Sequence, residues 1–332
     1  MATAVDRRLA ARLMCIGFDG PVLNDAAREM IHAGVSGVIL FARNATSHDE
    51  LRVIAAAVKT CGAESHGPPI FVSIDHEGGR VVRLRSGMTV VGAMREVGRS
   101  GVEEASRVGA LFARELRSAN VDLDFAPVVD VDSNPANPVI GERSFSADPA
   151  IVARCGAAFI TALQSGGVAG CAKHFPGHGD TAVDSHLALP RLSHAIERLR
   201  AIELPPFAAA ARAGVASIMT AHVVFDAVDP GVPATMSRRV IEGVLRDELG
   251  FEGVVFSDCL EMEAIASTMS TGEAAVRAIE AGVDCVIICH RLDRQREAID
   301  ALASAIASGR LPRARVLQAV TRLDGMMQRF VR

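Results

Sequence analysis

The sequence contains no tryptophan and no tyrosine, and only 13 of its 332 residues are phenylalanine. The chain therefore cannot offer the broad aromatic platforms that proteins use to grip long polysaccharides, and any sugar it binds is expected to be small and held by charged hydrogen bonds. The seven cysteines include no C-x-x-C pair, and most lie within apolar runs. This usage is typical of small core residues in a reducing compartment.

Strong charge and long apolar runs are also missing. The net charge is −4 and the basic residues are scattered, which argues against nucleic-acid binding. No segment approaches the roughly 20 uncharged apolar residues of a membrane span. The apolar run at 13–18 is too short for the core of a signal peptide. We therefore expect a soluble, cytoplasmic protein with no membrane or nucleic-acid partner.

Short β-branched apolar runs recur along the chain and alternate with Ala-, Leu- and Arg-rich stretches of helical spacing. Eight such strands predict a parallel sheet closed into a TIM-type (β/α)8 barrel. The helical stretches include 47–60, 102–119, 149–164, 196–213, 237–248 and 272–281. Two longer loops, around 75–101 and 132–148, are expected to lie on one rim. No linker or repeat divides the chain, so residues 1–332 are expected to form one domain, with 314–330 as an additional closing helix. Ser47, Asp148, Ser193 and Ser237 are the predicted helix N-caps. The eight runs are 13–18, 35–41, 70–74, 121–131, 168–172, 216–221, 253–257 and 285–289.

Polar residues gather where these strands end, which in a barrel is one shared mouth. The densest group follows the fifth strand, where Lys173–Thr181 is trailed by Asp184-Ser185-His186. Desolvating so many titratable groups costs several kcal/mol unless they are paired or used. We therefore predict an active site at this mouth, with Gly177 and Gly179 allowing the loop to move.

Several residues have a structural interpretation beside the functional one. Asp258 emerges from a buried strand, where it could act chemically or cap the next helix. His186 could be a surface residue, although Asp184 is close enough in an extended loop to orient its ring. Lys173 and His174 could contact a ligand or form buried ion pairs. His222 and His290 could line the mouth or bond local backbone groups.

Six segments of the sequence, which include these candidate residues or lie near them, together resemble glycoside hydrolase family 3. Within that family they resemble the single-domain bacterial β-N-acetylglucosaminidases (β-N-acetylhexosaminidases) of cell-wall recycling. The resemblance spans most of the barrel in the expected order, and the Lys173–Thr181 run with its trailing Asp-Ser-His is highly specific. The matching segments are 74–83, 124–130, 141–145, 173–181, 184–186 and 256–258.

The resemblance implies a retaining exo-β-N-acetylglucosaminidase that removes terminal GlcNAc from muropeptides or chitooligosaccharides. Asp258 would be the nucleophile, and His186 paired with Asp184 the acid/base. No metal or cofactor is implied. Two residues depart from the family pattern: His76 replaces an expected glutamine, and Cys259 stands where an acidic residue is common. The residues implied to hold the sugar are Asp75, Arg83, Arg143, Lys173 and His174.

Other functions remain open at this stage. A phosphorylase that uses phosphate in place of water, or a broader β-glycosidase, would share the family's residues. The histidines at 174, 178 and 186 with Asp258 could instead serve a metal-dependent barrel hydrolase. Lys173 at a strand end would suit a Schiff-base aldolase.

Overall fold

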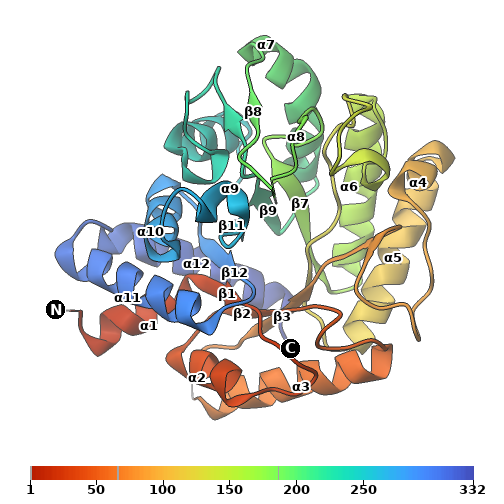
Figure 1. The fold of residues 1–332 in the computed structure, drawn as a ribbon. Coiled ribbons are helices and arrows are strands. Elements are labelled where there is room, and N and C mark those ends of the chain that lie inside the picture. The colour runs from red at the N-terminus through yellow and green to blue at the C-terminus, as the bar shows by residue number, and fades with distance from the viewer. Residues whose placement is uncertain (1, 66, 186) are drawn as a thin grey trace.

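The computed structural model describes residues 2–65, 67–185 and 187–332. Eight parallel strands close into a barrel in which each strand neighbours the next one along the chain (Figure 1). The predicted (β/α)8 barrel is confirmed, and each of the eight apolar runs overlaps one barrel strand, although β7 and β11 extend past the ends of their runs. The strands are β1 (Met14–Ile16), β2 (Gly37–Leu40), β3 (Phe71–Ile74), β6 (Leu123–Asp124), β7 (Ala169–Phe175), β9 (Ser217–Thr220), β11 (Val254–Cys259) and β12 (Cys285–Ile288).

Helices surround the barrel and bury their apolar faces against it. All six of the predicted helical stretches between strands contain helix. Those packed around the outside are α2 (Asp25–Ala33), α3 (His48–Glu64), α5 (Val102–Ser118), α6 (Pro149–Ser165), α8 (Leu204–Arg212), η4 (Arg239–Glu248), α10 (Thr271–Ala281) and α11 (Leu292–Ser308), with α1 (Ala4–Arg12) preceding the first strand.

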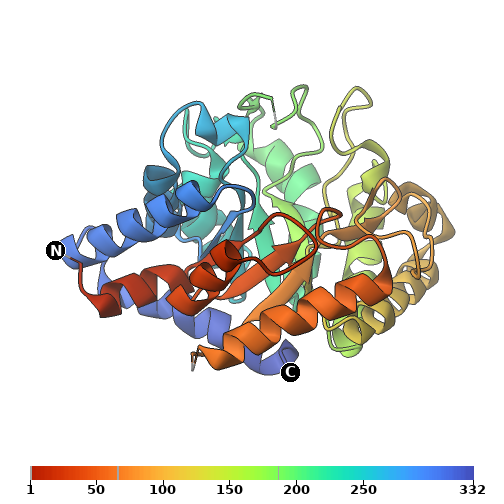
Figure 2. The same ribbon diagram turned by 60° about the horizontal axis from the view of Figure 1, so that its bottom comes forward.

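The expected closing helix is α12 (Arg313–Phe330). Its residues Leu323, Met326, Met327 and Phe330 pack with the side chains that fill the barrel, including Phe256. Figure 2 shows this helix at one end of the barrel and the long connecting loops at the other. The filled interior and the helix leave the loop end as the open mouth.

Two of the predicted N-caps are confirmed, because Ser47 accepts from the N–H of Glu50 and Asp148 from that of Ala150. Ser193 is not a cap: its helix begins at 196, and its hydroxyl donates to Asp226 instead. Ser237 accepts from the N–H of Val240 at the start of η4. Ser237 thus bonds to the first turn of η4, although the N-cap of that helix is Arg238.

Short elements decorate the mouth. The two loops around 75–101 and 132–148 lie side by side, as expected, and are joined by ion pairs between Arg95 and Asp132 and between Arg143 and Glu77. None of the helices among the described residues combines the length and the hydropathy that a membrane-spanning segment needs. The remaining elements are β4 (His76–Gly78), β5 (Val81–Val82), α4 (Met94–Ser100), η1 (Gly141–Arg143), β8 (Arg191–Leu192), α7 (Ile196–Arg198), η2 (Leu199–Glu203), β10 (Val224–Phe225), η3 (Ala234–Met236) and α9 (Glu263–Ala266).

Candidate active site

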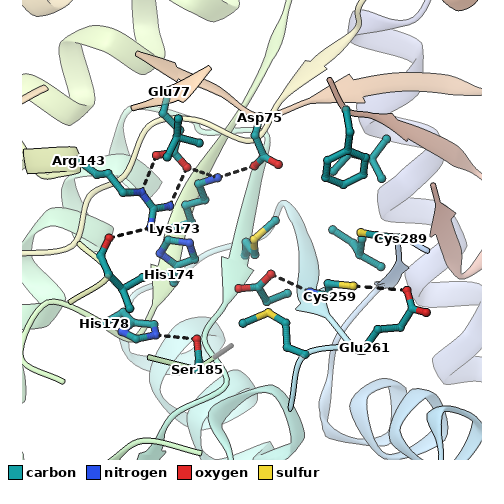
Figure 3. A pocket seen from close by; sticks show the side chains of 18 of the residues that line it. Asp75, Glu77, Arg143, Lys173, His174, His178, Ser185, Cys259, Glu261 and Cys289 are labelled. Atoms are coloured by element: carbon teal, nitrogen blue, oxygen red, sulfur yellow. Dashed lines mark hydrogen bonds and ion pairs between the residues drawn. The ribbon is translucent and has the colours of Figure 1, made fainter. Parts of the chain in front are cut away.

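A cavity of about 480 Å³ opens at the carboxyl ends of the barrel strands. Strands β3, β7, β11 and β12 each contribute charged or nucleophilic side chains to its wall, directly or from the residues just after them. Figure 3 shows Asp75, Glu77, Arg143 and Lys173 on one side of this cavity, and Cys259, Cys289 and Glu261 on the other. The titratable residues in its lining are Asp75, Glu77, Arg83, Arg143, Lys173, His174, His178, Asp258, Cys259, Glu261, Glu263, Cys289 and His290.

Lys173 lies at the centre of the charged group. Its Nζ is 2.7 Å from Asp75 Oδ1 and 2.7 Å from Glu77 Oε1. Arg83 Nη2 binds the other oxygen of Asp75 at 2.7 Å. Burial opposes ionisation of Asp75, but Lys173 and Arg83 outweigh it and lower the pKa of that carboxyl. The buried ion pairs expected of Lys173 are therefore present, and its contact with a ligand stays a prediction that its place in the cavity wall allows.

Glu77 and Arg143 form a bidentate pair in which the guanidinium Nε and Nη2 each donate over 2.8 Å. Glu77 is buried, yet Arg143 and Lys173 overcome the cost of burial and lower the pKa of its carboxyl. Planar two-point pairing of this kind fixes both partners in position. Glu77 lies within the segment that carried the family resemblance, but its role as the partner of two cations was not predicted.

Asp130 organises the two histidines that follow β7. It accepts from His174 Nδ1 at 2.8 Å, and from the backbone N–H groups of His174 at 3.1 Å and of His178 at 2.7 Å. Because a carboxylate only accepts, Nδ1 of His174 carries the proton. Lys173 and His174 are joined by a cis peptide bond, and both side chains line the cavity.

Asp258 lies near the end of β11, and its Oδ1 accepts from the backbone N–H of Cys259 at 2.7 Å. Burial raises its pKa, but His222 and His174, with that N–H, outweigh burial, so the pKa of Asp258 is lowered. The next helix, α9, has Met262 at its N-cap. The helix-capping interpretation of Asp258 is therefore wrong, and an ionised carboxylate faces the cavity.

The two histidines left open differ in position. His222 is buried, with its ring bonded to Thr235 Oγ1 at 2.8 Å and to the carbonyl oxygen of Cys259 at 3.0 Å. His290 is exposed and lines the cavity. His222 therefore supports the backbone beside Asp258, whereas His290 belongs to the cavity wall.

The loop after β7 is held by His178. Its Nδ1 is 2.8 Å from Thr181 Oγ1, and its Nε2 is 3.0 Å from Ser185 Oγ. Burial and the neighbouring His174 lower the pKa of His178 to about 4, so its ring is neutral. His186 lies outside the described residues, but Ser185 immediately before it lines the cavity. Asp184 is half-buried in the same loop.

The two departures from the family pattern differ in consequence. His76 is buried away from the cavity with its ring edge-on to Phe112, the centroids 4.7 Å apart. Cys259 lines the cavity directly after Asp258. Among the described residues, two clusters of side chains have a spacing that could hold a metal ion, and neither cluster contains His174, His178 or Asp258.

A closed parallel barrel whose mouth presents fixed ionised carboxylates beside ammonium and guanidinium groups defines an enzyme for a small polar substrate. Residues 8–325 match the family described as Glycosyl hydrolase family 3 N terminal domain. The chain belongs to glycoside hydrolase family 3.

Relatives agree with this assignment. A protein of Methylococcus capsulatus named beta-hexosaminidase is 38% identical over 87% of this chain and 86% of its own length. One of Neisseria gonorrhoeae with the same name is 39% identical over 82% and 79%.

Solved structures show the same barrel. The family 3 beta-N-acetylglucosaminidase of Paenibacillus sp. str. FPU-7 superposes with a TM-score of 0.95 and 44% identity, covering 97% of this chain, which spans 62% of that longer protein. NagZ from Neisseria gonorrhoeae, solved with N-trifluoroacetyl-D-glucosamine, gives a TM-score of 0.78 and 32% identity over 95% and 97%.

Proposed function

We propose that this chain is a retaining exo-β-N-acetylglucosaminidase that releases terminal β-linked GlcNAc from small glycans such as muropeptides or chitooligosaccharides, with residues 1–332 acting as one catalytic domain. The observation that carries the proposal is Asp258, a half-buried carboxylate with a lowered pKa in the wall of a small cavity. The names of the relatives and the glucosamine derivative bound in a structural neighbour support the choice of sugar.

The charged side of the cavity suits a monosaccharide. Asp75, Arg83, Arg143, Lys173 and His174 offer acceptors and donors held in place by their own ion pairs. Sugar hydroxyls can both donate and accept, so they can bind this set without rearranging it. Because the pairs exist before the sugar arrives, little side-chain entropy is lost on binding.

The reaction proceeds in two displacements. Asp258 Oδ attacks the anomeric carbon as the bond to the leaving oxygen breaks, and His186 gives that oxygen its proton. The glycosyl ester is then cleaved by water, which returns its proton to His186 and frees Asp258. Most retaining glycosidases use a second carboxylate as the acid/base. Here an imidazole, oriented by Asp184, serves because histidine exchanges protons near neutral pH.

The test is turnover of 4-nitrophenyl N-acetyl-β-D-glucosaminide beside the corresponding glucoside, with and without phosphate, and with EDTA. We expect free GlcNAc as the product, slow or no turnover of the glucoside, and no loss of activity with EDTA. A sugar phosphate formed only with phosphate would establish a phosphorylase. Equal turnover of both sugars would establish a broader β-glycosidase, and loss of activity with EDTA a metal-dependent hydrolase.

A further inference from the structure

Three side chains with soft or borderline donor atoms meet on the side of the cavity opposite Lys173. Cys259 ends β11, and Cys289 and His290 directly follow β12. The two strands are parallel neighbours, with Cys259 paired to Ile287, so Cys289 lies two residues further along the adjacent strand. One donor atom from each residue lies within 4.8 Å of the other two.

The cluster of Cys259, Cys289 and His290 is open to the cavity, and hydrogen bonds to Glu261 hold part of its backbone in place. All three residues line the cavity, with Cys289 buried, Cys259 half-buried and His290 exposed. Glu261 accepts from the backbone N–H of His290 at 2.6 Å and from that of Arg291 at 3.0 Å. Its carboxylate also lies 3.9 Å from Cys259 Sγ, as Figure 3 shows. Glu261 thereby fixes the backbone that carries His290.

The donor set has a definite chemical preference. Two thiolates and one imidazole suit Zn²⁺ and similar ions, whereas Mg²⁺ and Ca²⁺ prefer oxygen. Tetrahedral bonds of about 2.0–2.3 Å to zinc place two sulfur atoms and one nitrogen atom roughly 3.5–3.8 Å apart. The three donor atoms lie within 4.8 Å of one another, so small side-chain rotations can bring them to this spacing.

The two cysteine sulfur atoms lie close enough to bind one ion together. Two sulfur atoms placed this close cannot both become anionic without a cation between them. A divalent ion removes the repulsion, and each thiol loses one proton to solvent as its bond to the metal forms.

We propose that Cys259, Cys289 and His290 form a binding site for a soft or borderline divalent cation such as Zn²⁺ in the wall of the active-site cavity. The ion takes three protein ligands and keeps a fourth position facing the cavity. Since Cys259 follows Asp258 in the chain, the bound ion lies beside that carboxylate and narrows the space for substrate. Zn²⁺ is accordingly expected to inhibit. This inhibition rests on the proposed function, whereas metal binding does not.

Binding is tested without substrate by titrating the full chain with Co²⁺ in the presence of a non-thiol reductant. The expected result is one Co²⁺ per chain, with a thiolate-to-cobalt charge-transfer band in the near ultraviolet and the intense visible bands of tetrahedral cobalt. Zn²⁺ should displace the Co²⁺ and abolish these bands. Absence of a charge-transfer band at saturating Co²⁺ would overturn the proposal, even if Zn²⁺ inhibits turnover.

Variants locate the site. Cys289→Ser should about halve the charge-transfer band, and Cys289→Ser and His290→Ala should each weaken Co²⁺ binding at least about tenfold. His290 is exposed, so its variant keeps the test valid if removal of the buried thiol impairs folding. Cys61→Ala is the matched control, since His32, Cys61 and Glu64 form the other group of metal-compatible spacing in the described chain. Loss of the band in Cys61→Ala, or its full retention in His290→Ala and Cys289→Ser, would refute the assignment.

Discussion

The protonation states of single side chains at the mouth of the barrel result from opposing effects of burial and charge. At Asp258 burial favours the protonated acid, while the surrounding histidines and the N–H of Cys259 favour the carboxylate and prevail. Asp75 has the same balance, with Lys173 and Arg83 as its stabilising partners. Ionised carboxylates inside a small cavity are what a nucleophile and a hydroxyl acceptor require.

The pH dependence of turnover follows from the Asp258 carboxylate. A carboxyl group whose pKa is lowered stays ionised at every pH above its ordinary pKa, which is 3.8 for Asp258. It becomes protonated only as the pH falls further. We expect the acidic limb of kcat/KM for the aryl N-acetylglucosaminide to lie below pH 3.8, in protein that regains full activity at neutral pH. A reversible acidic limb centred above about pH 5 would contradict the ionised state assigned to Asp258.

The acid role of His186 predicts a dependence on the leaving group. His186→Ala should slow alkyl or sugar leaving groups by far more than 4-nitrophenol, because the aryl oxide departs without a proton. The measurement is kcat/KM for both kinds of substrate in the variant and the wild type. Equal losses for the two kinds would show that His186 does not protonate the leaving oxygen.

The sequence predicts which residues lie at the site better than it predicts which of them pair with each other. Lys173, Asp75 and Asp258 each follow or end a recognisable apolar run, which predicts their place at the mouth. Nothing in the sequence pairs Glu77 with Arg143, 66 positions later, or Asp130 with His174. These pairs depend on which loops the closed barrel brings together, a property of the complete fold.

At the scale of elements, the loop after β7 is held by packing as well as by polar contacts. A Cβ at Gly179 would lie 1.7 Å from the carbonyl oxygen of Val131, and Gly177 adopts a φ of 142° against Glu203. These glycines are thus required by close approach and backbone conformation. The sequence suggested a mobile loop, and their tight surroundings give a second explanation for the same two residues.

The contact between His178 and Ser185 makes this loop testable. Ser185→Ala removes a hydrogen bond of 3.0 Å to a buried ring, directly before His186. A bond of about 1 kcal/mol predicts a fall in kcat of roughly fivefold for substrates with poor leaving groups, with KM nearly unchanged.

The control is Ser193→Ala, whose hydroxyl donates to the half-buried Asp226 and does not line the cavity. It should leave kcat unchanged. If Ser185→Ala slows aryl and poor leaving groups equally, the contact does not act through the proton donor.

Element prediction is accurate for strands and weaker for two helices. Buried strands of a barrel read as continuous apolar runs, so all eight were recognisable. The stretches at 196–213 and 237–248 were expected as ordinary helices, but they include the π-helical segments η2 and η4. Pro205 and Pro206 lack N–H groups and interrupt the α-helical ladder at α8, an effect that amphipathic spacing does not show.

For the whole molecule, stability must depend on pH because some histidines are buried as neutral rings. His76 packs edge-on to Phe112, and burial lowers its pKa from 6.5 to about 4. Between pH 6.5 and about pH 4, the unfolded chain binds a proton at His76 that the folded chain does not bind. The contribution of His76 to the free energy of unfolding is therefore fully present above pH 6.5 and is lost as the pH falls toward 4.

His76→Gln should remove this part of the pH dependence. From about pH 7 to about pH 5 the wild type should lose roughly 2 kcal/mol of unfolding free energy through His76, and the variant should lose correspondingly less. Urea unfolding at the two pH values measures the difference. His32→Gln, at an exposed histidine, should behave like the wild type. Equal losses in His76→Gln and the wild type would show that His76 does not stay neutral in the fold.

The central claim is that Asp258 becomes covalently attached to the sugar. It is tested most directly by incubating the protein with a slow fluorinated N-acetylglucosaminyl substrate, digesting it and identifying the labelled peptide by mass spectrometry. We expect one glycosyl group per chain, on Asp258, and none in Asp258→Ala. A label on another side chain, or complete turnover with no labelled peptide at any time, would contradict it.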